Sequence, residues 1–290
     1  MEDRDWLILQ VLYEQKNITK TAHILFLSQP ALTARLRQIE EEFGAKIVYR
    51  CSKGVHFTTQ GEYLAKSAGE MLLKIRTIKE HVSNMEKEVT GTLRLGASNF
   101  FTKYKLPPLL KLFRNQYPQV EFKVTTGWSK DVFNSLYNQD IHVGFIRGDY
   151  SWQGEKYLLS EESMCIASID KIDINDLPHL PMIDYQTDSS IKPLIDNWWR
   201  DTFSEPPSII MSVNQLDTCK EMVVNGLGYA IIPRIILNDM ENLHIIDLTD
   251  KNGNPIIRRT WMIYHHELLE MNIIKVFVDF IKTLDFHKFV

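Results

Sequence analysis

The chain has 290 residues, which is enough for two or three domains with a sizeable core. Hydrophobic residues make up 44% and charged residues 24% of the sequence, as in an ordinary globular protein. A net charge of −4 excludes a uniformly basic protein, and no apolar run approaches the length of a membrane span. The charged run Glu2–Asp5 stands where a signal peptide would need an apolar core, so we expect a cytoplasmic protein with no membrane partner.

Residues 17–44 are predicted to form two short helices joined by a tight turn. Asn17 is a good N-cap for the first helix, and Ser28 is one for the second, which carries Pro30 in its first turn. Gly44 is a typical residue to end the second helix. The first helix should pack through Ala22 and Leu25. The second should pack through an apolar stripe of Leu32, Leu36, Ile39 and Phe43.

The other face of the second helix carries side chains that can hydrogen-bond to base edges in a major groove. Residues 46–50 and 53–57 then indicate a β-hairpin wing, which offers cations to phosphates. The alternative is a small helical bundle with solvated faces, because residues 16–59 carry seven Lys/Arg against three Glu, a charge of only +4. The predicted DNA-binding residues are Ser28, Gln29, Pro30, Thr33, Arg35, Arg37, Arg50 and Lys53.

This region resembles the LysR-type transcriptional regulators. Their pattern Ala-x-x-Leu-x-x-Ser-Gln-Pro-Ala-Leu-Ser/Thr matches Ala22, Leu25 and the run Ser28–Thr33. The chain departs from many members at Ala34, where they have arginine, and Arg35 and Arg37 can compensate. The resemblance implies that residues 1–58 form a winged helix-turn-helix that binds interrupted palindromic double-stranded DNA.

Residues 59–90 are predicted to form a linker helix through which two copies of the chain associate. The run Thr59–Glu62 has the form of a capping box, and Gly91 is the expected end. Apolar side chains recur in steps of four and three, which is typical of a coiled coil; the alternative is one amphipathic helix packed on its own domain. The seam consists of Leu64, Ala68, Met71, Ile75, Ile78, Val82, Met85 and Val89.

Residues 91–290 alternate predicted strands with helices, an α/β pattern in which ligands bind at the carboxyl ends of strands. Gly226–Pro233 leads into a strand instead of leaving one, which excludes a phosphate-binding loop. We expect strands at 92–97, 120–125, 141–146, 181–185, 208–212, 228–232 and 259–264, and helices at 107–117, 130–138, 192–203, 215–225 and 272–284.

Gly226–Pro233 also matches the G-x-G-x-x-x-x-P segment of the LysR family. The resemblance implies an effector domain of two α/β lobes, similar to periplasmic binding proteins. Lobe 1 would comprise about 91–160 and 265–290, and lobe 2 about 161–264. The expected fold is α+β and multidomain, with a winged helix-turn-helix, a dimerisation helix and this two-lobed domain.

Polar side chains stand at the expected strand ends of both lobes, and two arginines among them suit a small polycarboxylate. Each charge-assisted hydrogen bond could contribute about 1.5–3 kcal/mol. The predicted effector-binding residues are Ser98, Asn99, Ser129, Arg147, Gln186, Asn214, Thr218 and Arg258.

Structural roles are the alternative for several of these residues. Arg147 could pair with Asp140 or Asp149. Of the neighbours Arg258 and Arg259 only one can enter the cleft, because adjacent strand residues face opposite sides. The hydroxyls of Ser98 and Thr218 could simply cap helices.

Five short motifs resemble the catabolite control regulators of the CcpC/CcpE type from low-GC Gram-positive bacteria. That resemblance implies citrate as the effector, held by Ser98, Arg147 and Arg258, and control of tricarboxylic acid cycle genes by a dimer or tetramer. Another metabolite, an amino acid or an aromatic acid, is the alternative, because Trp128 and Phe145 stand near the expected cleft. The motifs are Gly127–Ser129, Ser135–Tyr137, Ile146–Gly148, Thr218–Met222 and Ile257–Trp261.

The sequence gives little support to an enzyme or a metalloprotein. A hydrolase would need a nucleophile elbow around Ser98, and a solute-binding protein would not carry the N-terminal motif. No Cys-x-x-Cys pair is present, and His265–His266 lacks further ligands at a suitable spacing. We expect no cofactor and no metal. The cysteines are interpreted as buried or incidental, with a redox sensor as the alternative: Cys51, Cys165 and Cys219.

Overall fold

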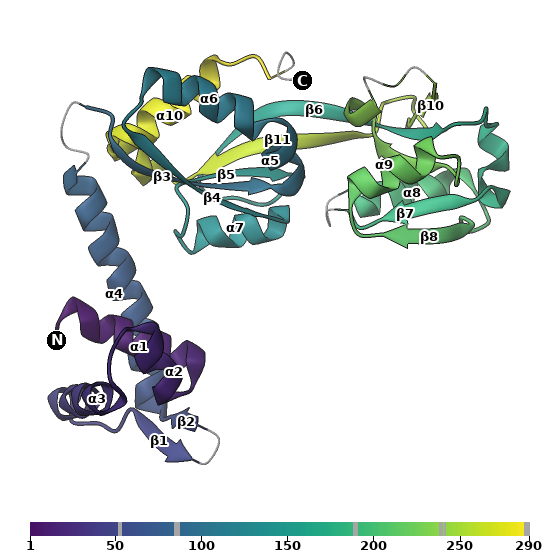
Figure 1. The fold of residues 1–290 in the computed structure, drawn as a ribbon. Helices are drawn as coiled ribbons and strands as arrows, with labels where there is room; N and C mark the ends of the chain where they lie inside the picture. The colour runs from purple at the N-terminus through teal and green to yellow at the C-terminus, as the bar shows by residue number, and fades with distance from the viewer. Residues whose placement is uncertain (52–53, 84–87, 188–190, 238–239, 241, 287–290) are drawn as a thin grey trace. The chain divides into compact units, whose positions relative to one another are not determined.

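The computed structural model describes residues 1–51, 54–83, 88–187, 191–237, 240 and 242–286. The chain divides into two compact units, residues 1–86 and 87–290, which Figure 1 shows with their helices and strands. Among the described residues, none of the helices has the length and apolar character needed to cross a membrane.

The first unit contains four helices and a two-stranded antiparallel hairpin among its described residues. Its core lies between the helices, and the predicted caps are confirmed. Asn17 accepts a hydrogen bond from the Lys20 amide at 3.0 Å, and Ser28 Oγ accepts one from the Ala31 amide at 3.3 Å. Gly44 ends the second predicted helix in the left-handed conformation, at φ +62°. The elements are α1 (Asp3–Gln15), α2 (Ile18–Ile24), α3 (Gln29–Phe43), β1 (Val48–Cys51), β2 (Gly54–Phe57) and α4 (Thr59–Ser83).

The predicted apolar stripe of α3 is confirmed for three of its four residues. Leu32, Leu36 and Ile39 are buried. Phe43 was wrongly included, because it is 42% exposed and only its ring edge meets Trp6. It is the last residue of α3, about one turn beyond Ile39.

The start of α4 differs from the predicted capping box by one residue. Thr58, not Thr59, accepts a hydrogen bond from the Gly61 amide at 2.9 Å, and its hydroxyl donates to the Lys46 carbonyl at 2.6 Å. A Cβ atom at Gly61 would lie 2.1 Å from the Ile47 carbonyl oxygen. Glycine is therefore required for the close approach of α4 to the wing.

The end of α4 also differs from the prediction. The helix ends at Ser83, residues 84–87 including Met85 lie outside the described residues, and Val89 is not helical. Val89 packs instead against the core of lobe 1. The predicted linker helix of residues 59–90 is therefore too long at its C-terminal end.

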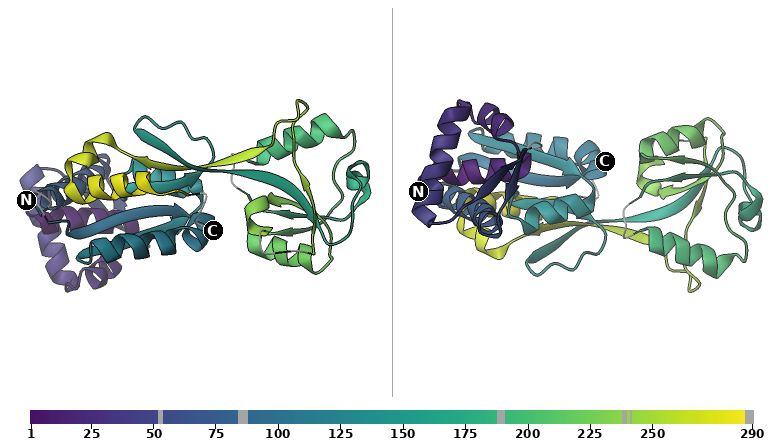
Figure 2. Two further views of the ribbon diagram at one scale, coloured as in Figure 1. Left: turned by 90° about the horizontal axis from the view of Figure 1, so that it is seen from above. Right: turned by 90° about the horizontal axis from the view of Figure 1, so that it is seen from below.

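The second unit consists of two lobes joined by two long antiparallel strands, β6 (Glu155–Ser168) and β11 (Ile257–Tyr264), which Figure 2 shows passing side by side from lobe to lobe. In lobe 1, β3 (Gly91–Ser98) pairs in parallel with β4 (Val120–Gly127) and β5 (Val143–Arg147). Thr260–Tyr264 of β11 pairs with β5, so these residues belong to lobe 1. The predicted lobe boundary at residue 264 is corrected to about 259.

Helices cover both faces of the lobe 1 sheet. Phe113 and Phe277, from α6 and α10, pack on one face with Phe145, while Val132 of α7 packs on the other with Ile146. Successive side chains of β5 point to opposite faces of the sheet, and both faces are buried. The strand ends at Arg147. The helices of this lobe are α5 (Asn99–Tyr104), which was not predicted, α6 (Leu106–Gln116), α7 (Ser129–Tyr137) and α10 (Asn272–Thr283).

In lobe 2, two short strands pair antiparallel with the second half of β6, and two further short strands pair with each other in parallel. The strand predicted at 228–232 begins two residues later, at Ala230, and a Cβ atom at Gly228 would lie 2.3 Å from the Pro181 carbonyl oxygen. The strand at 244–247 was not predicted. The elements are β7 (Met182–Tyr185), α8 (Lys192–Thr202), β8 (Ile209–Val213), α9 (Leu216–Val224), β9 (Ala230–Pro233) and β10 (His244–Asp247).

Two of the three cysteines are structural. Cys165 and Cys219 are fully buried, and burial raises the pKa of each thiol to about 12. Both thiols therefore stay protonated and unreactive near neutral pH, which disfavours the redox-sensor alternative for them. Cys51, in β1, is exposed.

Candidate functional site

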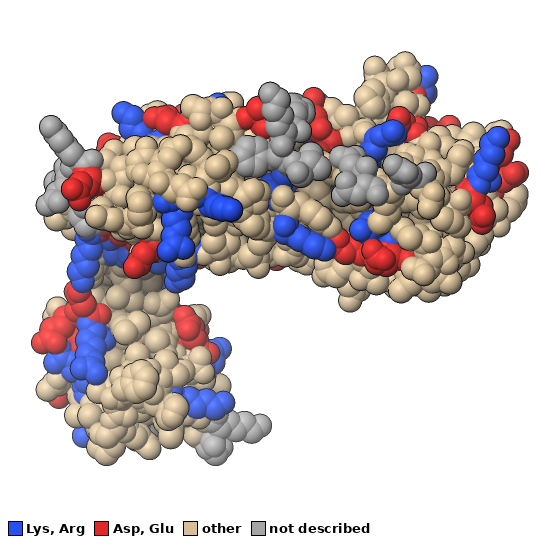
Figure 3. Space-filling model, turned by 45° about the horizontal axis from the view of Figure 1, so that its top comes forward, with Lys and Arg blue, Asp and Glu red and all other residues tan. Residues whose placement is uncertain are grey.

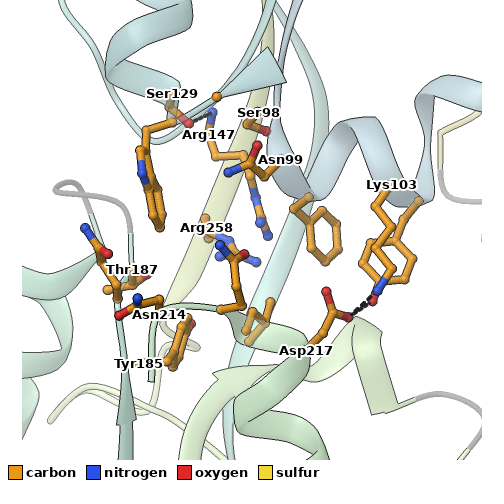
Figure 4. A pocket seen from close by; sticks show the side chains of 17 residues that line it. Ser98, Asn99, Lys103, Ser129, Arg147, Tyr185, Thr187, Asn214, Asp217 and Arg258 are labelled. Carbon is orange, nitrogen blue, oxygen red and sulfur yellow. Dashed lines mark hydrogen bonds and ion pairs between the residues drawn. The ribbon is translucent and has the colours of Figure 1, made fainter. Parts of the chain in front are cut away.

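A cavity of about 200 Å³ lies between the two lobes of the second unit. Lobe 1 contributes the ends of β3 and β5 and the start of α7, lobe 2 contributes the ends of β7 and β8, and β11 forms part of the wall. Figure 4 shows side chains from both lobes projecting into this space. The size fits a small metabolite, being smaller than pockets for drug-sized ligands.

Seven of the eight predicted effector residues line this cavity. Thr218 is the exception, because it is exposed and α9 turns the preceding residues Leu216 and Asp217 toward the cavity instead. The seven are Ser98, Asn99, Ser129, Arg147, Gln186, Asn214 and Arg258. Their part in binding an effector stays a prediction.

The two arginines of the cavity are both buried and share one carboxylate. Arg147 Nη2 donates to Glu162 Oε2 at 2.8 Å, and Arg258 Nη2 donates to the same oxygen at 3.1 Å. The proposed pairing of Arg147 with Asp140 or Asp149 was therefore wrong.

Only one of the neighbouring arginines on β11 enters the cavity, as the alternation required. Arg258 is buried there, whereas Arg259 lies on the surface and donates to Glu161 at 2.8 Å. Glu161 and Glu162 face these two arginines across the β6–β11 pair. The adjacent acidic residues on β6 and the adjacent basic residues on β11 were visible in the sequence. The strand register that pairs them could not be predicted from it.

Several buried donors in the cavity have no partner among the described residues. They are the Nε atoms of Arg147 and Arg258 and the hydroxyls of Ser98 and Thr187. A buried polar group without a partner is costly, and a carboxylate oxygen would accept from any of these donors. The donor set therefore fits an anionic ligand.

Neighbouring groups hold the arginines in place. The Arg147 backbone amide donates to Ser129 Oγ at 3.1 Å, which ties the end of β5 to the start of α7. The Phe100 ring lies 3.8 Å from the Arg147 guanidinium carbon, within range of a cation–π contact. The nearby Lys105 is buried, and burial lowers the pKa of its amine, although the charge of Glu162 acts in the opposite direction.

A polar contact at the edge of the cavity connects the two lobes. Lys103 Nζ of α5 lies 2.8 Å from Asp217 Oδ1 of α9, and the Tyr104 hydroxyl donates to the same carboxylate. Burial raises the pKa of Asp217, but the hydrogen bonds from Lys103 and Tyr104 outweigh it and hold that pKa below its usual value. Sequence reasoning did not identify this contact.

Most of the DNA-binding residues predicted at α3 are exposed. Ser28, Gln29 and Pro30 lie at the start of the helix, Arg37 lies in its middle, and Thr33 is half-buried. Their exposure is compatible with reading bases. Gln29 Oε1 accepts a hydrogen bond from the Thr19 hydroxyl at 3.3 Å.

Arg35 is placed differently from the prediction. Its Nη2 donates to Asp5 Oδ2 at 2.8 Å, and its Nε donates to the other oxygen of that buried carboxylate. Arg35 therefore holds α3 against α1, and a contact between Arg35 and DNA stays a prediction. The Arg50 side chain and Lys53, also predicted, lie outside the described part of the structure.

Surface charge is mixed over the face that Figure 3 draws, where Lys and Arg lie among Asp and Glu. In the first unit, Lys46 is paired with Glu40 at 2.8 Å, which offsets one basic residue of the wing. Charge on this face therefore does not by itself mark a binding surface.

Comparisons with known proteins agree with this architecture. The family described as "LysR substrate binding domain" matches residues 86–285, and the family described as "Bacterial regulatory helix-turn-helix protein, lysR family" matches residues 4–62. The chain is 43% identical over 282 residues to the "Uncharacterized HTH-type transcriptional regulator YraN" of Bacillus subtilis (strain 168), covering 97% of this chain and 98% of that protein. The regulator YkuM of the same organism is 35% identical over 279 residues, covering 96% and 95%.

Solved structures show the same fold over nearly the whole chain. Full-length CbnR complexed with its target DNA superposes with a TM-score of 0.67 at 18% identity, covering 97% of this chain and 99% of that one. The Vibrio cholerae virulence activator AphB superposes with a TM-score of 0.62 at 15% identity, covering 98% and 100%.

Proposed function

This chain belongs to the LysR family of DNA-binding transcriptional regulators, and we propose that a small polycarboxylate, citrate, is the effector that controls it. The observation that carries the proposal is the buried pair Arg147 and Arg258, whose Nε donors have no partner among the described residues. Ser98, on the same wall of the cavity, adds a hydroxyl donor. These are the three residues to which the sequence resemblance assigns citrate binding.

Of the alternative effectors, an amino acid fits the cavity less well than a polycarboxylate, whereas an aromatic acid has one stacking partner there. An amino acid would need a free carboxylate for its ammonium group, but Asp217 is already bound to Lys103 and Tyr104. An aromatic acid could stack on Trp128, which lines the cavity. Phe145 offers no such surface, since it is buried in lobe 1 at 4.5 Å from the ring of Phe101.

The effector would act by favouring one arrangement of the two lobes. A ligand shifts such an equilibrium only through its different affinity for the two states. Donors on both lobes face the cavity, so a ligand that contacts both would favour the closed state. Closure would in turn reorient dimers within a tetramer bound to an interrupted palindrome in the cytoplasm, changing expression of tricarboxylic acid cycle genes.

The uncovered part of α4 supports self-association. Leu64 and Ala68 of the predicted seam are buried within their own unit. Met71, Ile78 and Val82 are 41%, 51% and 60% exposed. The later turns of the seam are therefore available to a second copy, and two copies would place two α3 helices on one palindrome.

Thermal unfolding with and without ligand tests the effector. At one hundred times its Kd, a specific ligand adds about 2.7 kcal/mol to the free energy of unfolding, which raises the Tm visibly. We expect citrate to do this for the wild type and for the surface control Arg259→Gln, but not for Arg147→Gln. DNA binding without effector should survive in both variants. A wild type that does not respond to citrate, or a response that Arg147→Gln retains, contradicts the proposal.

A further inference from the structure

Glu162 lies behind the two arginines as seen from the cavity. Arg147 and Arg258 both line the cavity, whereas Glu162 does not. All three side chains are at most 3% exposed. The carboxylate therefore influences a ligand through its charge and through the arginines, without touching the ligand.

The charges in this cluster are unequal. Two guanidiniums meet one carboxylate, and a single oxygen, Oε2, accepts from both at 2.8 and 3.1 Å. The three side chains together carry one unit of positive charge, and the buried amine of Lys105 is close enough for the charge of Glu162 to act on it as well. In a buried site of low effective dielectric, one unit of charge has a large effect on the binding of an ion.

The position of Glu162 on the chain fixes it in this role. It stands on β6 directly opposite Arg258 on β11, in the segment where both strands pass between the lobes. Arg147 reaches it from the end of β5 in lobe 1. Hydrogen bonds from Arg147 of β5 and Arg258 of β11 therefore hold this carboxylate of β6 from two sides.

We propose that Glu162 is a specificity-determining residue that limits the negative charge of the ligand the cavity accepts. The inference rests on the proposed function, since it requires an anionic effector. Removing the carboxylate charge raises the attraction for every anion in proportion to the charge of that anion. A mere packing defect at the same position changes the affinity of all ligands alike.

The test is calorimetric titration of the full-length protein with butyrate, succinate and tricarballylate, which carry one, two and three carboxylates on similar carbon chains. Citrate is titrated alongside, at one ionic strength and at a pH where every carboxylate is ionised. We compare the wild type with Glu162→Gln, which keeps the shape of the side chain. Glu161→Gln is the matched control, because it removes the adjacent carboxylate, which pairs with Arg259 on the surface.

In Glu162→Gln we expect the gain in affinity to grow with ligand charge, by roughly tenfold for each added carboxylate. Glu161→Gln should bind like the wild type. If the gain is the same for all ligands, or if affinity falls, the inference is wrong. If Glu162→Gln does not fold, Glu162→Asp is used instead, because its side chain is one methylene shorter and holds the carboxylate farther from the arginines. Its gain in affinity should be smaller and should again grow with the charge of the ligand.

The two proposals fail in different ways. If the wild type binds citrate but the change in affinity at Glu162 variants does not depend on ligand charge, only the proposed role of Glu162 is wrong. A wild type that binds none of the carboxylates contradicts the proposed effector, and the role of Glu162 with it.

Discussion

Each unit of this protein contains a buried carboxylate held by arginine, and the two arrangements differ in what remains for other partners. In the first unit, both oxygens of Asp5 accept hydrogen bonds from Arg35, which also lies 3.6 Å from a carboxylate oxygen of Glu2, so no positive charge is left over. In the second unit, one oxygen of Glu162 accepts from two arginines. The first cluster has no surplus of positive charge, whereas the second keeps a surplus and, among the described residues, donors without a partner.

This difference separates a structural ion pair from a candidate binding site. Arg35 fastens α3 to α1, and its hydrogen bonds leave little for a phosphate. Arg147 and Arg258 are positioned by Glu162 but not satisfied by it. Both regions carry arginines that the sequence marks as functional, and only the number of partners around each guanidinium distinguishes their roles.

The largest expected effect comes from removing the shared counter-ion. Without ligand, Glu162→Gln should lower the free energy of unfolding of the second unit by about 3–5 kcal/mol, because two buried guanidiniums lose their partner. Chemical denaturation measures this loss. Glu161→Gln, which breaks a pair on the surface, should cost at most about 1 kcal/mol. Equal stability of Glu162→Gln and wild type would show that the arginines do not depend on this carboxylate.

Breaking the ion pair between Asp5 and Arg35 should have a smaller effect on stability. Asp5→Asn should lower the stability of the first unit by about 1–3 kcal/mol, because Arg35 is 35% exposed and can turn toward water. The same denaturation experiment measures it, and citrate binding should not change. If folded Arg35→Gln loses DNA affinity below its unfolding temperature, Arg35 contacts DNA and the comparison between the two regions fails.

A third variant concerns the turn between α2 and α3. Phe26 has a φ of +54° and is 93% exposed, so it adopts the left-handed conformation without gaining packing. Asparagine tolerates this conformation better than phenylalanine. Phe26→Asn should therefore raise the stability of the first unit by about 1 kcal/mol, seen as a higher Tm. A lower Tm would mean that the exposed ring contributes contacts in the folded protein.

The smallest effect is expected at the contact between the lobes, and it depends on pH. The pKa of Asp217 is lowered from 3.8, so its stabilising contribution is present above that value and is lost as the pH falls through the folded-state pKa. Because Lys103 and Asp217 are partly exposed, the contribution should be at most about 1 kcal/mol. The Tm of wild type should exceed that of Asp217→Asn near neutral pH, and the difference should shrink in acid. A difference independent of pH would rule out the carboxylate charge as its cause.

Features that depend on neighbours in the sequence were predictable. Asn17, Ser28 and Gly44 cap their helices as expected, because each cap is formed with residues three to five positions away. Thr58 was missed by a single residue, since its hydroxyl also binds the wing, which local spacing does not reveal.

Features that depend on distant strands were predictable only in part. Alternation along β11 indicated that one of Arg258 and Arg259 enters the cavity, but not which one. Glu162 was missed because its contact with Arg258 joins residues 96 positions apart, through a strand register that periodicity does not determine. Residues at strand ends were found more reliably than Thr218, whose helix turns it away from the cavity.

A crystal structure of the full-length protein with citrate would test the binding site directly. We predict a carboxylate between Arg147 and Arg258, accepting hydrogen bonds from their Nε atoms and from Ser98 Oγ, with Glu162 still bound to both guanidiniums. Citrate bound elsewhere in the molecule, or bound in this cavity without contact to either arginine, would contradict it.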